Sequence, residues 1–377
     1  MRRINWLLSC MAVMLLCGCG RAEEQESKKR IKIGVTVYDR YDTYLKEYMD
    51  IFESLMAERR TAGAQEISVE ISDSVTSQLT QNEQVSNMIQ NGCDVLCVNL
   101  VDRTAPLQII DEAKRNDIPV IFFNRELVEE DLMRWSQLYY VGADAEESGR
   151  MEGELAAEDI LKKSVDETAE TEPAAASESG QIAASDLTAE GGAAVFSAAD
   201  RNRDGVIQYV VLEGEAGHQD TIIRSEASVK AITDAGIRVE KLGYGIANWN
   251  RAEAQNRMKQ LYDSYGTEIE LILCNNDDMA LGVLDAYEGF GVSPEDRPLI
   301  YGIDGTTVGL DAVYKGSLAG TVYNDKEAQA EALCELAMRL SNHESLDDLP
   351  LKDGKYIRTP YQKVTRENVQ EFMKRQN

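Results

Sequence analysis

The chain has 377 residues, enough for two domains of about 100–200 residues each, and its formal net charge at pH 7 is −27. Such an acidic chain argues against nucleic acid as a partner, because phosphate binding requires a basic surface. The acidity instead suits an exported protein that holds cations.

The first 18 residues have the pattern of a bacterial signal peptide. Two arginines precede an apolar run, Trp6 to Leu16, that is too short to cross a bilayer. The following Leu16-Cys17-Gly18-Cys19 resembles a lipoprotein box, in which Cys19 would carry the lipid and begin the mature chain. The alternative is an ordinary secretory signal with incidental cysteines. Residues 19–30 are polar and charged, which predicts a flexible tether that holds a folded body at the membrane.

The body of the chain alternates between strand and helix patterns. Strands are predicted at 31–38, 67–72, 95–99, 118–124 and 139–142, and helices at 44–60, 78–90 and 105–116. After a break, helices are predicted at 149–161, 222–235, 251–264 and 279–287, and strands at 207–213, 237–242, 271–275 and 299–302. This rhythm predicts an α/β fold with two similar doubly wound parallel-sheet lobes. Ligands in such sheets bind beyond the carboxyl ends of the strands, which places a cleft between the lobes.

The break, residues 162–199, is rich in Ala, Ser, Glu and Thr and has little periodic apolar pattern. Such a stretch cannot bury enough surface to offset its ordering entropy. We therefore expect a disordered surface insertion between a helix and the loop that follows it.

The segment from Asp200 to Gln208 matches the first two-thirds of an EF-hand calcium loop. Oxygen-bearing side chains stand at loop positions 1, 3, 5 and 9, glycine stands at position 6, and position 7 can offer its carbonyl. The candidate ligands are Asp200, Asn202, Asp204, Val206 and Gln208. Position 12 is Val211 instead of the closing Glu, and residues 206–212 have a strand pattern instead of the exiting helix. The string is either fortuitous or a calcium loop completed from elsewhere in the chain.

Polar side chains recur at the carboxyl ends of the predicted strands. Asn, Asp, Arg and His pair with hydroxyl groups, and flat aromatic rings cover the C–H faces of a sugar. Each residue alone has a plainer explanation, because Asn and Asp commonly form turns and a lone Trp is usually core. Their recurrence at so many strand ends favours a site for a neutral polyol. The residues are Asp42, Tyr44, Asn124, Arg125, His218, Asp220, Arg224, Trp249, Asn275, Asn276, Asp277, Asp304, Asn324 and Asp325.

Four cysteines lie in the body of the chain. Cys97 and Cys274 sit in apolar strand patterns, where a free cysteine behaves as a small hydrophobic residue. Cys93 and Cys334 lack the spacing of metal ligands. We predict neither a disulfide framework nor a zinc site.

Several strings carry a resemblance to one family. They include Ile33-Gly-Val-Thr-Val-Tyr38, Val98-Asn-Leu-Val-Asp102, Gly214-Glu-Ala-Gly-His218-Gln-Asp220, Asn275-Asn-Asp277 and Gly302-Ile-Asp304. From about Ile31 to the C-terminus the chain resembles the periplasmic galactose/glucose-binding proteins of bacterial ABC transporters, which have the type I periplasmic-binding-protein fold. The resemblance implies two lobes joined by three crossover segments. The first lobe would comprise 31–142 plus 325–358, and the second 143–324 plus 359–377.

The resemblance also implies a ligand set. Hydrogen bonds to the sugar would come from Asp42, Asn124, His218, Asp220, Arg224, Asn276, Asp304 and Asn324, and ring stacking from Tyr44 and Trp249. Tyr44 departs from the Phe usual in the family, which keeps the stacking and adds a hydroxyl. The resemblance further implies a structural calcium ion whose shell is closed by Glu270, which requires the strand at 271 to lie beside the strand at 207.

The function implied is that of a monomeric solute-binding lipoprotein of an ABC importer. It would close by a hinge motion around D-galactose and/or D-glucose and deliver the sugar to a membrane permease. The alternative is a lipoprotein that presents the hexose to a membrane receptor. A hydrolase using His218 and Asp220 is disfavoured, because the chain has no Gly-x-Ser-x-Gly and no opposed carboxylate pair. A sugar-responsive repressor would need a helix-turn-helix. We therefore expect a binding protein, not an enzyme, held by lipid on the extracytoplasmic face of the membrane.

Overall fold

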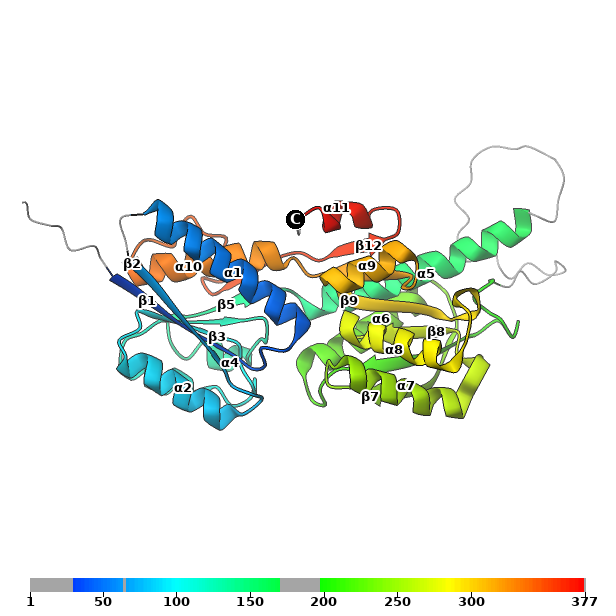
Figure 1. The fold of residues 1–377 in the computed structure, drawn as a ribbon, viewed down its shortest axis with the longest axis horizontal. Helices are drawn as coiled ribbons and strands as arrows, with labels where there is room; N and C mark the ends of the chain where they lie inside the picture. Colours follow the sequence, from blue (N-terminus) through cyan, green and yellow to red (C-terminus); the bar gives the residue numbers. More distant parts are fainter. Residues whose placement is uncertain (1–29, 64–65, 170–196, 376–377) are drawn as a thin grey trace, which may run out of the picture.

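Two lobes of helices and strands lie side by side in the computed structural model, which describes residues 30–63, 66–169 and 197–375 (Figure 1). The predicted signal peptide, Cys19 and residues 170–196 lie outside this described part, as does the predicted tether apart from its last residue. Within it, no helix has the length and apolar character needed to cross a membrane.

Each lobe is built on a six-stranded sheet with the crossover connections of a parallel α/β fold. The first sheet has the spatial order β11 (Tyr356–Arg358), β5 (Leu138–Gly142), β4 (Val120–Phe123), β3 (Val95–Val98), β1 (Arg30–Val37) and β2 (Glu66–Asp73). The second has the order β12 (Gln362–Thr365), β10 (Gly320–Tyr323), β9 (Leu299–Asp304), β8 (Leu271–Cys274), β6 (Ile207–Glu213) and β7 (Val239–Ile246). Among the strands of the described ranges, only β12 runs antiparallel to its neighbour. The predicted fold class is confirmed.

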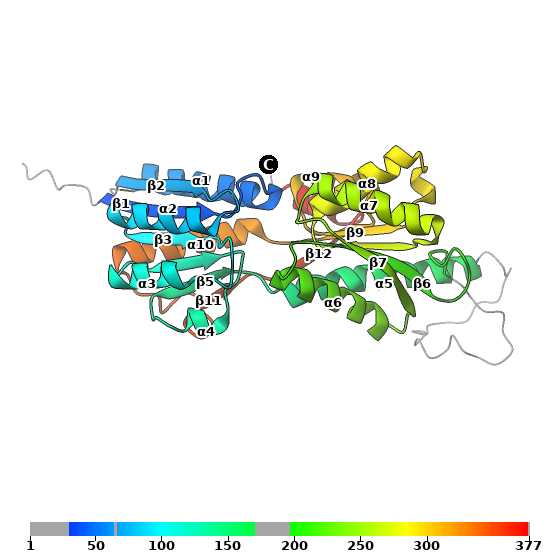
Figure 2. The same cartoon turned by 90° about the horizontal axis from the view of Figure 1, so that it is seen from below.

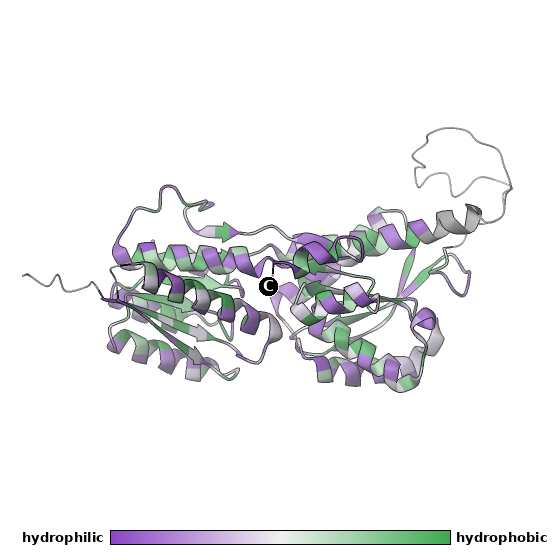
Figure 3. Cartoon of the chain, turned by 45° about the horizontal axis from the view of Figure 1, so that its top comes forward, coloured by the Kyte–Doolittle hydropathy of each residue, from purple (hydrophilic) through white to green (hydrophobic). Residues whose placement is uncertain are grey.

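Helices cover both faces of each sheet. The first lobe contains α1 (Thr43–Ala62), α2 (Gln78–Gln90), α3 (Leu107–Arg115), α4 (Glu129–Leu132) and α10 (Lys326–Asn342). The second contains α5 (Ala145–Ala169), α6 (Gln219–Asp234), α7 (Arg251–Tyr265), α8 (Asp277–Phe290), α9 (Thr307–Lys315) and α11 (Val369–Met373). Side chains of successive strand residues point into the hydrophobic cores on opposite faces of the sheet. In β6, Val210 packs with α7 and α8, whereas Val211 packs with α5 and α6. Figure 3 shows the hydrophobic strands at the centre of each lobe.

The chain crosses between the lobes three times, between β5 and α5, between β10 and α10, and between β11 and β12 (Figures 1 and 2). These crossings run close together in the middle of the molecule. Three adjacent segments of this kind suit a hinge, because a few backbone torsions can absorb a rotation of one lobe against the other.

The prediction that residues 162–199 form a disordered insertion is wrong at both ends of the segment. Helix α5 continues to Ala169, because adding a residue to an established helix costs far less than starting one. At the other end Ser197 Oγ donates to the Ile160 carbonyl at 2.7 Å, and Ala199 is buried against the second-lobe core.

Two glycines let α5 lie directly against α6. A Cβ atom on Gly149 would come within 2.5 Å of the Arg224 carbonyl, and one on Gly153 within 2.1 Å of the Ser228 carbonyl. Any larger residue would push the helices apart. The approach matters because α6 carries several of the predicted ligand residues.

Candidate ligand-binding cleft

A polar cavity lies between the lobes at the carboxyl ends of both sheets. Its volume, including the part open to solvent, is about 370 Å³. The lining residues are Tyr38, Asp42, Tyr44, Asn124, Arg125, His218, Asp220, Arg224, Trp249, Asn276 and Asp304.

Nine of the ten residues predicted to contact a sugar therefore line one cavity. The exception is Asn324, in the second crossover. Its Oδ1 accepts a hydrogen bond from Gln329 Nε2 at 2.6 Å, and its backbone N–H donates to the Asp304 carbonyl at 3.0 Å. Asn324 thus stabilises the backbone beside the cavity and does not line it.

The ligand prediction did not include Tyr38 and Arg125, which also line the cavity. The Arg125 guanidinium lies 3.5 Å from the centre of the Tyr38 ring, and Arg125 pairs with Glu215 of the other lobe at 3.0 Å. Both residues lie at the end of a predicted strand, and this position is the signal by which the sequence could have indicated them. Arg125 was already among the polar residues named at the strand ends. Nothing in the sequence showed that the two side chains stack.

The first lobe presents Asp42 and Asn124 with part of their hydrogen-bonding capacity already used. Asp42 begins α1, where Oδ1 accepts from the Leu45 N–H at 2.8 Å and Oδ2 accepts from the Tyr38 hydroxyl at 2.6 Å. Asn124 has a left-handed backbone, with φ of 61°, and its Oδ1 accepts from Asn99 Nδ2 at 3.0 Å. The Asn124 amide nitrogen remains to donate to a ligand.

His218 is a neutral hydrogen-bond donor. It begins α6, and its Nδ1 accepts from the Asp220 N–H at 3.1 Å. Burial, opposed by the charge of Asp220, lowers the pKa of His218 to about 4. The ring therefore carries its single proton on Nε2 at neutral pH, since Nδ1 acts as the acceptor.

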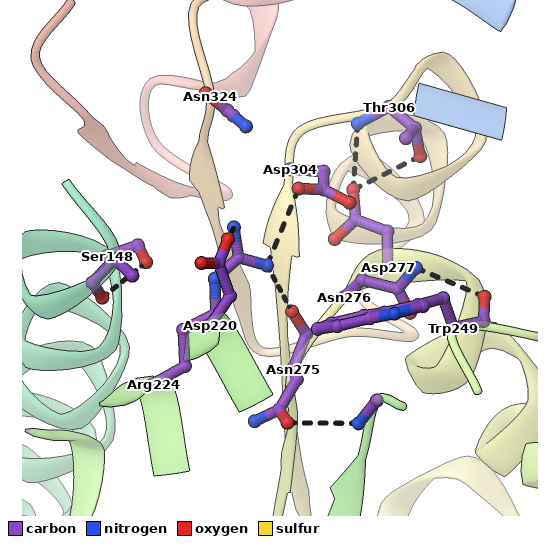
Figure 4. A network of polar contacts seen from close by, with 12 residues as sticks. Ser148, Asp220, Arg224, Trp249, Asn275, Asn276, Asp277, Asp304, Thr306 and Asn324 are labelled. Atoms are coloured by element: carbon purple, nitrogen blue, oxygen red, sulfur yellow. Dashed lines mark hydrogen bonds and ion pairs between the residues drawn. The ribbon is translucent and has the colours of Figure 1, made fainter. Parts of the chain in front are cut away.

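Arg224 is the buried charge at the centre of the second-lobe site (Figure 4). Its Nη1 donates to the Asn275 carbonyl at 2.6 Å and its Nη2 to the Tyr361 hydroxyl at 3.2 Å. Asp220 lies 3.6 Å and Asp304 3.9 Å from the guanidinium. Burial opposes its charge, but these neighbours together hold the pKa of Arg224 above its usual range.

Asp304 ends β9 with an uncommon backbone, φ of 122°, and its side chain is buried. Burial raises the pKa of Asp304 well above its usual range, although the charge of Arg224 opposes this. A non-glycine residue held in such a conformation is typical of a functional site.

Trp249 is set edge-on against His218, with ring centres 5.2 Å apart. A Cβ on Gly214 would lie 2.3 Å from the indole, so glycine there makes room for the ring. Asn276 fixes the backbone at this point, because its Nδ2 donates to the Trp249 carbonyl at 3.2 Å (Figure 4). Its Oδ1 accepts from the Met279 N–H at 2.9 Å, so Asn276 begins α8 as well as lining the cavity.

The two lobes touch each other on both sides of the cavity. On one side Thr43 Oγ1 donates to Asp278 Oδ2 at 2.6 Å, and the Thr307 N–H donates to Glu47 Oε1 at 2.9 Å. On the other side Arg103 donates to Gln219, beside the Arg125 ion pair already described. The structure therefore represents the lobes closed on the cavity.

Behind the cavity, α5 carries a fully buried acid, Glu152. Its Oε1 accepts from the Cys274 N–H at 3.1 Å, and its Oε2 lies 2.5 Å from Ser228 Oγ. Ser228 has one hydroxyl proton, which it can donate to the Arg224 carbonyl at 2.7 Å. A proton on the Glu152 carboxyl group would allow both contacts of Ser228 Oγ to be hydrogen bonds at once. Burial raises the pKa of Glu152 to about 7, which agrees with this assignment.

We expect Glu152→Gln to remove part of the pH dependence of stability. The folded-state pKa lies above the usual 4.5, so the folded protein holds this proton more tightly than the unfolded chain. Raising the pH through the window from 4.5 to 7 therefore lowers the free energy of unfolding, by up to about 3 kcal/mol for this group. Urea unfolding of the ligand-free protein at pH 5 and 7.5 measures the effect.

The variant should show a smaller loss of stability between these pH values than the wild type. Asp277, whose pKa burial also raises to about 7, keeps its own contribution in both proteins. His218 contributes the opposite slope in both proteins, since its folded-state pKa lies below its usual value. Equal pH dependence in variant and wild type would refute the assignment of a protonated Glu152.

The predicted calcium loop and Glu270 come together in the second lobe. Strands β6 and β8 are adjacent and Tyr209 pairs with Leu271, which puts Glu270 beside Gln208 as the sequence argument required. Glu270 Oε1 accepts from the Arg201 N–H at 2.5 Å, and its Oε2 accepts from the Gln208 N–H at 3.1 Å.

Hydrogen bonds to side-chain oxygens of the loop itself hold it in a compact conformation. Asp200 accepts from the N–H groups of Asp204 at 3.2 Å and Gly205 at 2.8 Å. Asn202 Nδ2 contacts both Asp204 Oδ2 at 3.0 Å and Gln208 Oε1 at 3.2 Å. No group of three acidic, histidine or cysteine side chains within the described ranges is close enough to hold a metal. A cation here would need the amide oxygens and the Val206 carbonyl as well as the carboxylates, which is the mixed oxygen set that calcium takes.

The four cysteines in the described part of the chain are buried and unpaired. Cys97 and Cys274 lie in β3 and β8, and burial raises the pKa of both thiols well above the usual range. They pack as small apolar residues.

Comparison with known proteins decides the family. A family model described as a periplasmic binding protein domain matches residues 33–345. The chain belongs to this family. It is 32% identical over 377 residues to the D-galactose/methyl-galactoside binding periplasmic protein of Haemophilus influenzae, covering 98% of each chain. It is 25% identical over 307 residues to a putative rhizopine-binding protein of Rhizobium meliloti, covering 81% of this chain and 82% of the relative.

Solved structures agree on the fold. An ABC transporter solute-binding protein from Bacillus halodurans with bound myo-inositol superposes with a TM-score of 0.68 at 24% identity, covering 92% of this chain and 98% of that one. The protein is therefore an extracytoplasmic solute-binding protein, and the expectation that it is not an enzyme is confirmed.

Proposed function

We propose that this protein is the binding component of an ABC sugar importer and that it holds D-galactose and/or D-glucose between its lobes. The observation that carries the proposal is the convergence of nine residues, far apart in sequence, on a single cavity. The relative from Haemophilus influenzae, similar over nearly the whole chain, is named for galactose binding, which supports the choice of hexose.

The cavity offers what a neutral polyol requires. A hydroxyl group both donates and accepts, so it suits a site where donors and acceptors alternate. Asp220 and Asp304 provide acceptors on either side of the Arg224 guanidinium, and His218 Nε2 provides a donor. Tyr44 from the first lobe and Trp249 from the second would cover the two faces of the sugar ring.

Closure would couple binding to transport. The bonds from Thr43 to Asp278 and from Thr307 to Glu47 join the lobes directly, so they exist only when the cleft is closed. A sugar that contacts both lobes favours this closed form over an open one. A membrane permease could then recognise the closed protein and receive the sugar when the lobes separate. The lipid on Cys19, outside the described residues, would keep the protein, a monomer, at the extracytoplasmic face of the membrane.

A structural calcium ion forms part of the proposal. Its ligands would be Asp200, Asn202, Asp204, Val206, Gln208 and Glu270. The ion would replace the hydrogen bonds between loop and β8 by stronger ionic bonds to oxygen. It would thereby brace β6, which leads directly into the loop that carries His218.

Calorimetry tests the proposed function. Purified protein titrated with galactose, glucose, ribose and xylose should release heat with at least one hexose. Asp220→Ala should abolish that heat, because it removes an acceptor beside the buried Arg224. Asp234→Ala, at the exposed end of the same helix, is the matched control and should bind normally. Absence of heat with both hexoses would overturn the proposal.

A further inference from the structure

Tyr44, which lines the cavity, has a buried hydroxyl group without a partner among the described residues. The Tyr44 hydroxyl and Arg224 Nε are both shielded from solvent, and neither has a hydrogen-bond partner in the part of the chain described. Leaving a buried polar group unpaired costs about 1–3 kcal/mol, so such groups are normally satisfied by protein, water or ligand. Both groups belong to residues that line the cavity.

Other tyrosines around the cavity do have partners. Tyr38 donates to Asp42 at 2.6 Å, Tyr140 donates to the Asn124 carbonyl at 2.9 Å, and Tyr361 accepts from Arg224 at 3.2 Å. The lack of a partner is therefore specific to Tyr44 among these side chains.

The Tyr44 side chain is buried beside a second tyrosine of α1. The residue is 4% exposed, and its ring stacks beside that of Tyr48, with centres 6.2 Å apart. Burial raises the pKa of Tyr44 well above its usual range, and Tyr361 and Asp304 add to this effect. The hydroxyl is thus protonated. It has one proton to donate and lone pairs to accept.

We propose that the Tyr44 hydroxyl is a specificity-determining group that forms a hydrogen bond with one particular hydroxyl of the bound hexose. The inference rests on the proposed function, since it needs a sugar in the cavity. A site built to bond a substrate hydroxyl strongly rejects the analogue that lacks it, because the buried group of the site is then left unpaired. Tyr44 would in this way distinguish hexoses that differ at that carbon, beyond the stacking of its ring.

The test combines Tyr44→Phe with a series of monodeoxy sugars. The affinities of wild type and variant are measured by calorimetry for the preferred hexose and for its 2-, 3-, 4- and 6-deoxy analogues. In the variant the parent sugar should bind about ten-fold more weakly, as expected for one lost hydrogen bond. The penalty for one analogue should disappear in the variant, whereas the penalties for the others should remain. Such a coupling identifies the pair of groups directly.

Tyr48→Phe is the matched control. Tyr48 lies one turn further along α1, donates to the Gln329 carbonyl at 3.2 Å and does not line the cavity. Its variant should keep the wild-type ratios among the sugars. If Tyr44→Phe also keeps every ratio, the inference is overturned although the proposed function stands. If the wild type binds no hexose, the proposed function fails and the inference fails with it.

Discussion

Arg224→Ala is expected to weaken hexose binding by roughly one to four orders of magnitude. The guanidinium is buried, and two carboxylates lie within 4 Å, Asp220 at 3.6 Å and Asp304 at 3.9 Å. When the lobes close on the sugar, truncating one partner of a buried charge pair costs about 2–5 kcal/mol of binding free energy, because the remaining charge is desolvated and unpaired. At about 1.4 kcal/mol for each factor of ten, this gives the expected loss.

Calorimetry with the preferred hexose measures this loss, and circular dichroism checks that the variant is folded. Arg251→Ala is the matched control. Arg251 also pairs with a carboxylate, Asp285, at 2.6 Å, but its side chain is 47% exposed and does not line the cavity. An exposed pair is worth about 0–1 kcal/mol, so the control should bind normally. A folded Arg224→Ala protein with wild-type affinity would remove Arg224 from the binding site.

Calcium is expected to raise the melting temperature of the wild type by several degrees. A ligand at a hundred times its dissociation constant stabilises a protein by about 2.7 kcal/mol. For a lobe of this size, about 150–250 residues, each kcal/mol corresponds to about 2–4 °C. The gain arises because the ion holds the loop at Asp200 to the start of β8 at Glu270.

Glu270→Gln should abolish most of this gain, because the closing carboxylate is lost while the side chain keeps an oxygen for the Arg201 N–H. Glu268→Gln, two residues earlier and exposed, is the control and should respond to calcium as the wild type does. Thermal melts in calcium and in chelator, for all three proteins, give the comparison. Identical melts of the wild type in both conditions would exclude a calcium site at this loop.

Local pattern accounts for most of the fold that the sequence predicted. The boundaries of α2 and β6 match the prediction residue for residue. The helix predicted at 149–161 was too short at both ends, since α5 runs from Ala145 to Ala169. The elements after residue 302 were not assigned individually. Among them β12 is a short edge strand whose antiparallel pairing depends on where the chain returns, which no local period encodes.

The candidate site, like the fold, was predicted from the sequence only in part. Polar residues at strand ends were visible in the sequence, and parallel strands bring those ends to one edge, so most of the predicted ligands converge. The sequence could not show how each side chain shares its hydrogen bonds. Asn324 turns to Gln329, whereas Asn276 lines the cavity while also beginning a helix. These choices depend on neighbours brought in from other strands.

By itself the sequence determined the alternation of strands and helices, the residue types at the strand ends and the incomplete calcium loop, because each is written in local order and spacing. Only the tertiary structure decided that Glu270 lies beside Gln208, that Arg125 stacks on Tyr38, and that the Tyr44 hydroxyl is buried with no partner among the described residues. Those facts depend on strand register and on packing between lobes, where the groups that meet are far apart along the chain.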